Sequence, residues 1–261
     1  MLDPEKIYCG LNTKLLARKI ICFPKVDSTN QIALELGRKG YPEGTMVIAE
    51  EQTAGRGRWR RRWHSPPEKS LLFSMILRPQ IPPELMPQLA LVAGVSTARA
   101  IHLQTGIKPG IKWPNDLIYE GKKLCGILVE RAGSTDLCLV LGIGVNVNQE
   151  RDDFPPELQD TATSLRRIAG EIIPRVPLLQ QIVESLEEDY QEYCRAGFPP
   201  IRKRWLQYEV ILGKKVRIAM GNSEYWGKAI GLSENGELVV LSPQGEETKF
   251  AAGEVTLCRE E

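Results

Sequence analysis

Five arginines and two tryptophans fall within nine residues, Gly55 to Trp63, in the order Gly-Arg-Gly-Arg-Trp-Arg-Arg-Arg-Trp. Guanidinium groups are rarely buried without a partner, so this segment fits neither a buried strand nor the apolar face of a helix, and we expect a loop. Glycine lets a backbone approach a ligand closely, and the planar fork of arginine suits phosphate and carboxylate groups. The sequence therefore predicts an anion-binding loop.

Two other interpretations of this loop compete with an enzyme site. A basic loop can contact nucleic acid through its charges, with Trp59, Trp63 and Trp226 as stacking platforms. A dinucleotide-binding fingerprint fits less well, because Arg60 stands at the position of its third glycine. The strand-like run of residues 71–77 also follows the loop, where that fold needs a helix. We therefore set the dinucleotide fingerprint aside and keep the nucleic-acid alternative.

The segments around the loop are predicted to form strands and helices. Residues 46–49 and 70–77 are apolar runs typical of strands, and residues 85–103 are apolar on most faces, as in a helix that packs on a sheet. A helical pattern that ends near Gly40 follows the polar residues 27–30, any of which is suited to cap it. The two strands are expected to flank the arginine loop.

Further along the chain, three segments carry residues that plain strands do not need. Lys112-Trp113-Pro114-Asn115-Asp116 forms a polar corner before a strand predicted at residues 124–130, and the strand-like run of residues 137–147 contains Gly142 and Gly144. Glycine inside a strand costs stability and often marks a place where a ligand approaches the backbone. We expect the corner, the glycine-bearing strand and the arginine loop to meet in one region.

The two ends of the chain differ in predicted secondary structure. A short helical pattern at Leu11, Leu15 and Leu16 precedes the first strand, and strong helices are predicted at residues 177–197 and 201–208. Five short alternating runs follow between Lys214 and Cys258, separated by turn pairs such as Asn235-Gly236, and predict a small SH3-like β-barrel. We expect two domains, residues 1–210 and residues 211–261.

Composition limits the class of protein. With 42% hydrophobic and 26% charged residues the chain is typical of a soluble globular protein, and its net charge of +1 argues against a general coat for polyanions. Six cysteines without a C-x-x-C pair, and only two histidines, argue against a zinc site and favour buried free thiols in a reducing cytoplasm. No signal peptide or membrane-length apolar run is present. We expect a cytoplasmic protein with no membrane span and no metal site of its own.

Taken in order, five segments resemble the biotin protein ligase family. They are residues 27–30, residues 52–58 with Trp63, residues 112–116, residues 123–130 and residues 142–146. The similarity runs from about residue 10 to the C-terminus and implies an α+β catalytic domain, a mixed sheet with helices of class II synthetase-like type, followed by an SH3-like domain. Arg60 departs from the family pattern, which usually has glycine there. The N-terminal winged helix of the bifunctional members has no room here, so a monofunctional ligase without sequence-specific DNA binding is expected.

The resemblance implies a two-step reaction that uses ATP, Mg²⁺ and biotin. The biotin carboxylate attacks the α-phosphate to give biotinyl-5′-AMP and pyrophosphate, and a lysine of a biotin carboxyl carrier protein then attacks the mixed anhydride. A site rich in Arg and Lys suits a reaction that brings two anions together. The protein is also expected to be able to form a homodimer. Lipoate protein ligase is the nearest alternative, since its fold and chemistry are alike, but the Gly-Arg-Gly-Arg loop argues against it.

The family motifs also imply roles for individual residues. Biotin is expected to contact Ser28, Thr29, Asn30, Gln52, Gly55, Arg56, Arg58, Lys123, Gly126, Leu128 and Gly144. ATP is expected to contact Arg56, Gly57, Arg58, Trp63, Asn115, Lys123 and Asn146. The catalytic residues are expected to be Arg58, Lys112, Asp116 and Lys123. Among these, Arg58 and Lys123 would hold the carboxylate and the α-phosphate, and Asp116 would hold and deprotonate the acceptor lysine.

Overall fold

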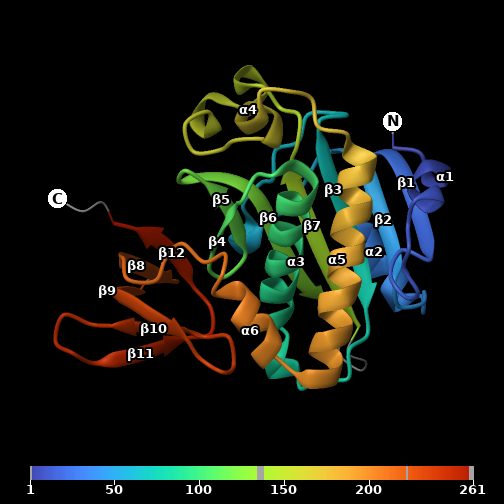
Figure 1. Ribbon diagram of the computed structural model, residues 1–261. Helices are drawn as coiled ribbons and strands as arrows, with labels where there is room; N and C mark the ends of the chain where they lie inside the picture. Colours follow the sequence, from blue (N-terminus) through green and yellow to red (C-terminus); the bar gives the residue numbers. More distant parts are fainter. Residues whose placement is uncertain (1, 134–137, 222, 259–261) are drawn as a thin grey trace.

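The computed structural model describes residues 2–133, 138–221 and 223–258, and these form two sheets (Figure 1). The strands of the larger sheet are β1 (Lys19–Val26), β2 (Thr45–Gln52), β3 (Ser70–Leu77), β4 (Gly110–Lys112), β5 (Asp116–Tyr119), β6 (Lys122–Arg131) and β7 (Leu139–Asn146). Their order is β1-β2-β3-β7-β6-β5-β4, with β1 and β2 parallel and the other neighbours antiparallel. The sheet is therefore mixed, as expected.

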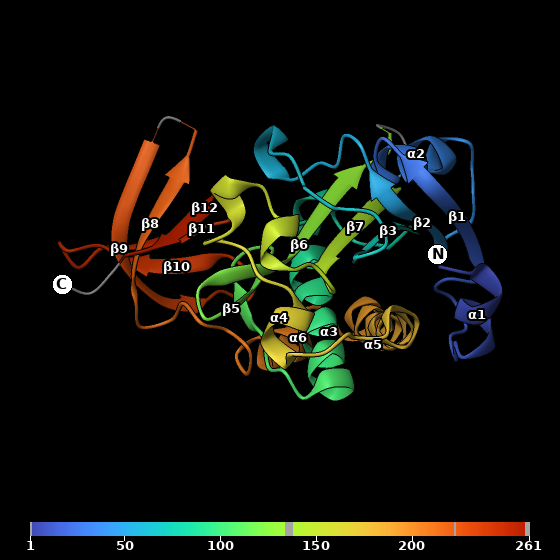
Figure 2. The same ribbon diagram turned by 90° about the horizontal axis from the view of Figure 1, so that it is seen from above.

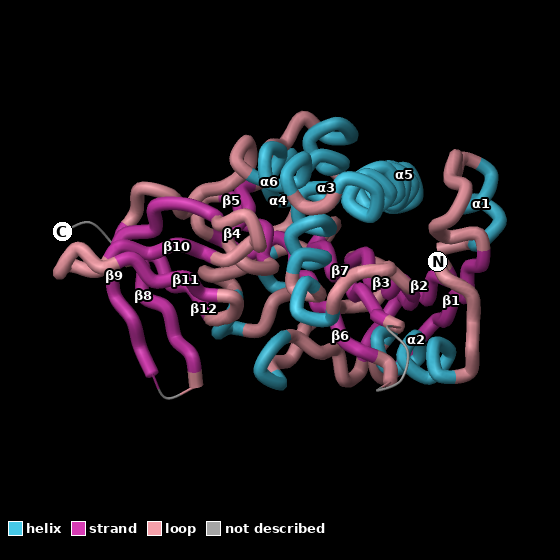
Figure 3. The backbone as a smooth tube through the Cα atoms, turned by 90° about the horizontal axis from the view of Figure 1, so that it is seen from below, coloured by secondary structure: helices cyan, strands magenta, loops and turns pink. Residues whose placement is uncertain are grey.

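Helices cover both faces of this sheet. The α-helices are α1 (Pro4–Cys9), α2 (Thr29–Arg38), α3 (Gln88–Thr105), α4 (Leu165–Ala169), α5 (Arg175–Ala196) and α6 (Pro199–Trp205). Four 3₁₀ turns are described, η1 (Arg58–Arg60), η2 (Pro83–Leu85), η3 (Arg151–Asp153) and η4 (Pro156–Leu158). Helices α3 and α5 lie side by side on one face, and α2 lies on the other (Figures 2 and 3). Among the described residues, no helix combines the length and apolar character that a bilayer crossing requires.

The alternation of side chains along a strand explains the two faces. On β3, Phe73 and Met75 belong to the large core under α3 and α5, whereas Ile76 packs in a smaller cluster with Leu34 of α2 and Val140 of β7. Every residue of β3 is buried, which is why the sequence of this strand is apolar except at Ser70 and Ser74. A cavity lined by Thr29, Asn30 and Gly144 lies on the α2 face.

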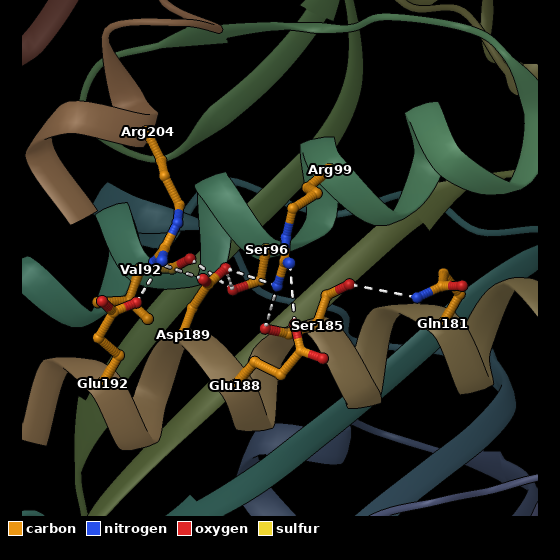
Figure 4. Close-up of polar contacts among 9 residues, drawn as sticks. All are labelled: Val92, Ser96, Arg99, Gln181, Ser185, Glu188, Asp189, Glu192 and Arg204. Carbon is orange, nitrogen blue, oxygen red and sulfur yellow. Dashed lines mark hydrogen bonds and ion pairs between the residues drawn. The ribbon is translucent and has the colours of Figure 1, made fainter. Parts of the chain in front are cut away.

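A polar network joins α3, α5 and α6 (Figure 4). The carboxylate of Asp189 accepts hydrogen bonds from Ser96 Oγ at 2.8 Å and from the Arg204 guanidinium at 2.9 Å, and Arg99 lies 3.4 Å away. Burial raises the pKa of Asp189, and Arg99, Ser96 and Arg204 oppose that shift. A buried charge is tolerated only when it is paired, so this network fixes α6 against α5.

The second sheet is antiparallel. Its strands are β8 (Lys215–Met220), β9 (Ser223–Leu232), β10 (Leu238–Leu241), β11 (Glu247–Phe250) and β12 (Glu254–Leu257), in the order β11-β10-β9-β8-β12. This confirms the expected small β domain. Figure 1 shows it beside the β4 and β5 end of the large sheet. The domain boundary after residue 210 stays a prediction.

Most predicted elements are confirmed, with one clear error. Residues 11–16 form an irregular segment rather than a helix, and the helix lies earlier, where Asp3 caps α1 and Pro4 occupies its first turn. The backbone N–H groups of residues 14–16 instead donate to the carboxylate of Glu187 on α5, each at 2.7 Å. Residue 137, the first of the predicted run 137–147, lies outside the described residues.

Candidate active site

Three glycines on β6 and β7 leave part of the α2 face of the sheet without side chains. Gly142 and Gly144 of β7 share this face, and Gly126 of β6 pairs with Gly144. A Cβ atom at Gly144 or at Gly126 would lie 2.8 Å from the indole of Trp63, and one at Gly142 would lie 2.0 Å from the Asn30 side chain. The glycines were predicted to admit a ligand, and in the described structure the groups nearest to them are Trp63 and Asn30.

The start of α2 contributes polar groups at one end of this floor. Ser28, one of the residues predicted to cap the helix, occupies the N-cap position, but its side chain makes no bond to the helix within the described structure. The amide oxygen of Gln52 does this instead, because it accepts a hydrogen bond from the Thr29 backbone N–H at 2.7 Å. The Thr29 hydroxyl lies 3.1 Å from the same oxygen. The first helical turn is thus coupled to the end of β2.

A second hydrogen-bond network holds Thr29 and Asn30 against the strands β3 and β6. Ser74 of β3 donates to Asn30 Oδ1 at 2.6 Å and is hydrogen bonded to the Thr29 hydroxyl at 2.8 Å. The amide of Asn30 in turn donates to Glu130 at 2.7 Å. Sequence reasoning did not find Ser74 or Glu130, and the available signal was that Ser74 is the one polar residue within the apolar run of residues 71–77.

The arginine loop closes on itself as a small hairpin. Trp63 N–H donates to Gly55 O at 2.9 Å and Gly57 N–H donates to Arg61 O at 2.7 Å, and η1 forms the tip, where Trp59 has a positive φ of 55°. A Cβ atom at Gly55 would lie 2.7 Å from the Trp63 carbonyl oxygen. Gly55 therefore permits the closure of the loop. It is not among the residues that line the cavity, unlike the other predicted site residues.

Arg58 reaches out of this loop to two other parts of the chain. Its guanidinium donates to Asn115 Oδ1 at 3.1 Å and to the backbone oxygen of Gly253 at 3.0 Å. Burial lowers the pKa of Arg58, while Asp116 and Glu254 raise it, and an arginine remains charged at neutral pH. The loop is thereby tied both to the 112–116 corner and to the second sheet.

The polar corner joins β4 to β5. Lys112 pairs with Asp116 across the turn, and Asp116 Oδ1 lies 2.7 Å from Lys123 Nζ. Burial lowers the pKa of Lys112, Asp116 opposes this shift, and the positive charge of Lys123 adds to it. Asn115 is fixed to β6 because its side-chain amide donates to Ile127 O at 2.9 Å. Lys112 and Asp116 of the corner and Lys123 of β6 therefore lie together near Arg58.

A loop between β7 and α4 closes the remaining side. Residues 161–163 run alongside Lys123, whose N–H donates to Thr161 O at 2.8 Å and whose carbonyl accepts from Thr163 N–H at 2.9 Å. Asn146 holds the same segment, since its amide donates to Thr163 O at 3.0 Å. This loop brings Phe154, Leu158, Thr161 and Ala162 to the cavity, and the sequence analysis missed all four.

These parts enclose one cavity of about 520 Å³. Apart from Gly55, its walls include every predicted site residue, namely Ser28, Thr29, Asn30, Gln52, Arg56, Gly57, Arg58, Trp63, Lys112, Asn115, Asp116, Lys123, Gly126, Leu128, Gly144 and Asn146. Residues 253–255 of the second sheet also line it, which the sequence did not predict. A cavity with cations on one wall and a bare sheet beneath can bind an anion attached to an apolar body.

Comparison with known proteins agrees with this arrangement. Residues 22–148 match the Biotin/lipoate A/B protein ligase family, and residues 211–257 match the Biotin protein ligase C terminal domain. The chain is 40% identical over 253 residues to the Bifunctional ligase/repressor BirA of Bacillus spizizenii, and the aligned region covers 96% of this chain and 78% of that protein. The chain belongs to the biotin protein ligase family. The expectation drawn from the five sequence segments is thereby confirmed.

Two further relatives of this biotin protein ligase extend the comparison. The Biotin--[acetyl-CoA-carboxylase] ligase of Paracoccus denitrificans is 31% identical, over 87% of this chain and 96% of that one. The structure of the biotin protein ligase from Aquifex aeolicus in complex with biotin and ATP is 34% identical, with a TM-score of 0.81, and covers 93% of this chain and all of that chain. The loop of residues 150–164 falls between the segments that the two family matches cover.

Proposed function

We propose that this biotin protein ligase uses ATP to attach biotin to one lysine of a biotin carboxyl carrier protein, through biotinyl-5′-AMP. The observation that carries the proposal is the cavity in which Arg58, Lys112 and Lys123 converge beside Gly126 and Gly144. Both substrates of the first step are anions, so cations held in place lower the barrier more than an enzyme nucleophile would.

The biotin pocket lies between the start of α2 and the strands. Thr29 and Gln52 offer a hydroxyl and an amide to the ureido head, and Leu128 and the Trp63 ring offer apolar contacts to the remainder. The unpaired indole N–H of Trp63, which has no hydrogen-bond partner among the described residues, is free to meet a ligand oxygen. Ligand contacts of Ser28, Asn30, Arg56, Gly126 and Gly144 are proposed on the same basis.

The nucleotide lies on the side of the corner and the 150–164 loop. Arg58 and Lys123 hold the carboxylate and the α-phosphate while a carboxylate oxygen attacks phosphorus and pyrophosphate leaves. The apolar residues Phe154, Leu158 and Ala162 form a slot suited to the flat adenine ring. Asn146 is proposed to contact ATP from the wall of this slot, where its side-chain amide also donates to Thr163 O.

Magnesium fits this site as a companion of ATP. Mg²⁺ prefers oxygen ligands and is commonly held by one or two carboxylates together with substrate phosphates. Asp116 supplies a carboxylate and Asn115 an amide oxygen at the corner. No group of three or more His, Cys, Asp or Glu residues suited to a metal occurs among the described residues. When bound, the ion would neutralise phosphate charge.

In the second step the carrier lysine attacks the acyl carbon and AMP leaves. Asp116 is proposed to orient that amine and take its proton, and its ion pair with Lys123 would exchange for a pair with the incoming lysine. Lys112 lies across the turn and adds positive charge at the departing AMP. A homodimer, a cytoplasmic location and the absence of sequence-specific DNA binding stay predictions, which sedimentation, fractionation and a gel shift at physiological salt would check.

The function is tested by incubating the protein with Mg²⁺ and ATP and either biotin or lipoate, and by measuring pyrophosphate release. We expect release with biotin and none with lipoate, followed by labelling of one lysine when a carrier domain is added. Release with lipoate alone would favour the lipoate ligase alternative. Release with neither acid, combined with tight binding of nucleic acid, would favour the nucleic-acid alternative.

A further inference from the structure

Two fully buried tryptophans differ in one respect. Trp113 and Trp205 expose at most 1% of their surface, yet only Trp113 has a partner for its indole N–H within the described part of the chain. That N–H donates to the backbone oxygen of Gly236 at 3.0 Å. Gly236 lies in the turn between β9 and β10, so this bond joins the middle of the catalytic corner to the second sheet.

Two other bonds hold the same turn against the catalytic domain. Gln88, at the start of α3, donates to Asn235 O at 3.1 Å, and Tyr193 of α5 donates to Gln88 Oε1 at 2.7 Å. Arg202 of α6 donates to Leu232 O at 2.7 Å at the end of β9. The acceptors in and next to this turn are all backbone carbonyls. The backbone of the turn, and not its side chains, therefore accepts the hydrogen bonds that fix its position.

The shape of the turn brings the Gly236 carbonyl close to Trp113. Gly236 has a φ of +81°, a region that favours glycine, and a Cβ atom there would lie 2.8 Å from the Leu91 side chain on α3. The turn is closed by its own bond from Ser233 N–H to Glu237 O at 2.8 Å. No larger residue at this position would allow the same close approach to α3.

We propose that Trp113 is a positioning residue, and that the β9–β10 turn aligns the nucleotide side of the active site through it. This inference rests on the proposed function. Lys112 precedes Trp113 directly, and Asn115 and Asp116 follow within three residues, so a shift of the indole moves the groups that face ATP. The start of α2 and Gln52, which face biotin, have no bond to this turn among those described. Loss of the Trp113 bond should therefore slow adenylate formation and leave biotin binding unchanged.

The test compares Trp113→Phe with Trp205→Phe. Both variants lose an indole N–H and volume from a buried site, but only the first loses the bond between the sheets. We expect Trp113→Phe to form biotinyl-5′-AMP about tenfold more slowly than Trp205→Phe in a single turnover, since a small misplacement of reacting groups is costly. The dissociation constant of biotin measured without ATP should be the same in both variants.

A second pair of variants keeps the inference testable if a tryptophan variant fails to fold. Gly236→Ala and Gly245→Ala place the same strain on a residue with positive φ, but Gly245 has no described heavy atom within 4 Å of an added Cβ. We expect slower adenylate formation only for Gly236→Ala. Equal rates within each pair, or a matching loss of biotin affinity, would overturn the proposal. Absence of biotinyl-5′-AMP with the unchanged protein would instead overturn the proposed function.

Discussion

Lys112 carries a charge that the folded protein disfavours. Burial lowers its pKa, and Lys123 repels it, while Asp116 gives partial relief. Below the lowered pKa both the folded and the unfolded chain hold the proton, so the full cost of burying the charge opposes folding. As pH rises toward the ordinary value of 10.5, the folded chain releases its proton first and this cost disappears. A residue kept at such a cost is expected to serve the reaction.

Replacing Lys112 by Met should raise stability and reduce activity. The free energy of unfolding should exceed that of the unchanged protein at neutral pH, and this advantage should vanish as the pH passes about 10.5, the ordinary lysine value. Adenylate formation should fall on the order of 100-fold through the lost positive charge. Urea unfolding at several pH values measures the first effect. Lys215→Met, at an exposed position, is the control and should change neither quantity; a less stable Lys112→Met protein would contradict the argument.

Replacing Arg58 and replacing Lys123 should impair different steps of the reaction. Arg58 belongs to the arginine loop and ties it to Asn115 and Gly253. Arg58→Gly removes these ties, so it should chiefly weaken retention of the adenylate. Lys123 lies on β6, so Lys123→Ala should slow adenylate formation itself. Escaped biotinyl-5′-AMP labels lysines of bystander proteins, and the ratio of bystander to carrier labelling measures the leak.

For Arg58→Gly we expect this ratio to rise about tenfold or more above the unchanged protein, and for Lys123→Ala we expect it to stay level while total labelling falls. Lys122→Ala changes the neighbouring lysine of the same strand and serves as the control. If Arg58→Gly forms adenylate too slowly to detect and labels no bystander, Arg58 belongs to the first chemical step and the division of roles is wrong.

At the scale of elements, the bare glycine face of β6 and β7 is what makes room for Trp63. Gly144→Ala adds a Cβ atom 2.8 Å from that indole, so the ring or the strand must move. We expect biotin to bind about tenfold more weakly, by roughly 1.4 kcal/mol, as calorimetry would show. Gly133→Ala is the matched change, because no described heavy atom lies within 4 Å of its added Cβ. Equal affinity in the two variants would show that the floor is not part of the biotin pocket.

Elements with a regular hydrophobic period were predictable from sequence, and segments shaped by distant partners were not. β3 and α5 follow from their apolar patterns alone. The irregular segment of residues 11–16 depends on Glu187, which lies more than 170 positions further along the chain. The loop that carries Phe154 is likewise placed by backbone bonds to Lys123. No local pattern records either partner, so both segments were misjudged or left open.

In the whole molecule, the second sheet contributes residues 253–255 to the wall of the cavity. Its own strands were predictable from alternation and turn pairs, but its docking was not. Gly236 and Gly253 meet the catalytic domain through carbonyl oxygens, which every residue type possesses, so the sequence holds no signature of these contacts. The motifs of the cavity were predictable because their chemistry depends on side chains, as at Arg58 and Lys123.

We propose that this cavity makes and holds biotinyl-5′-AMP. The most direct measurement is to mix the protein with biotin, ATP and Mg²⁺ without any carrier, remove free ligands, denature the chain and quantify the released compounds by mass spectrometry. We expect about one biotinyl-5′-AMP per chain, which disappears with matching biotinylation of a carrier lysine when a carrier domain is added before denaturation. Recovery of biotin and ATP unchanged, or of an adenylate formed from lipoate instead of biotin, would contradict it.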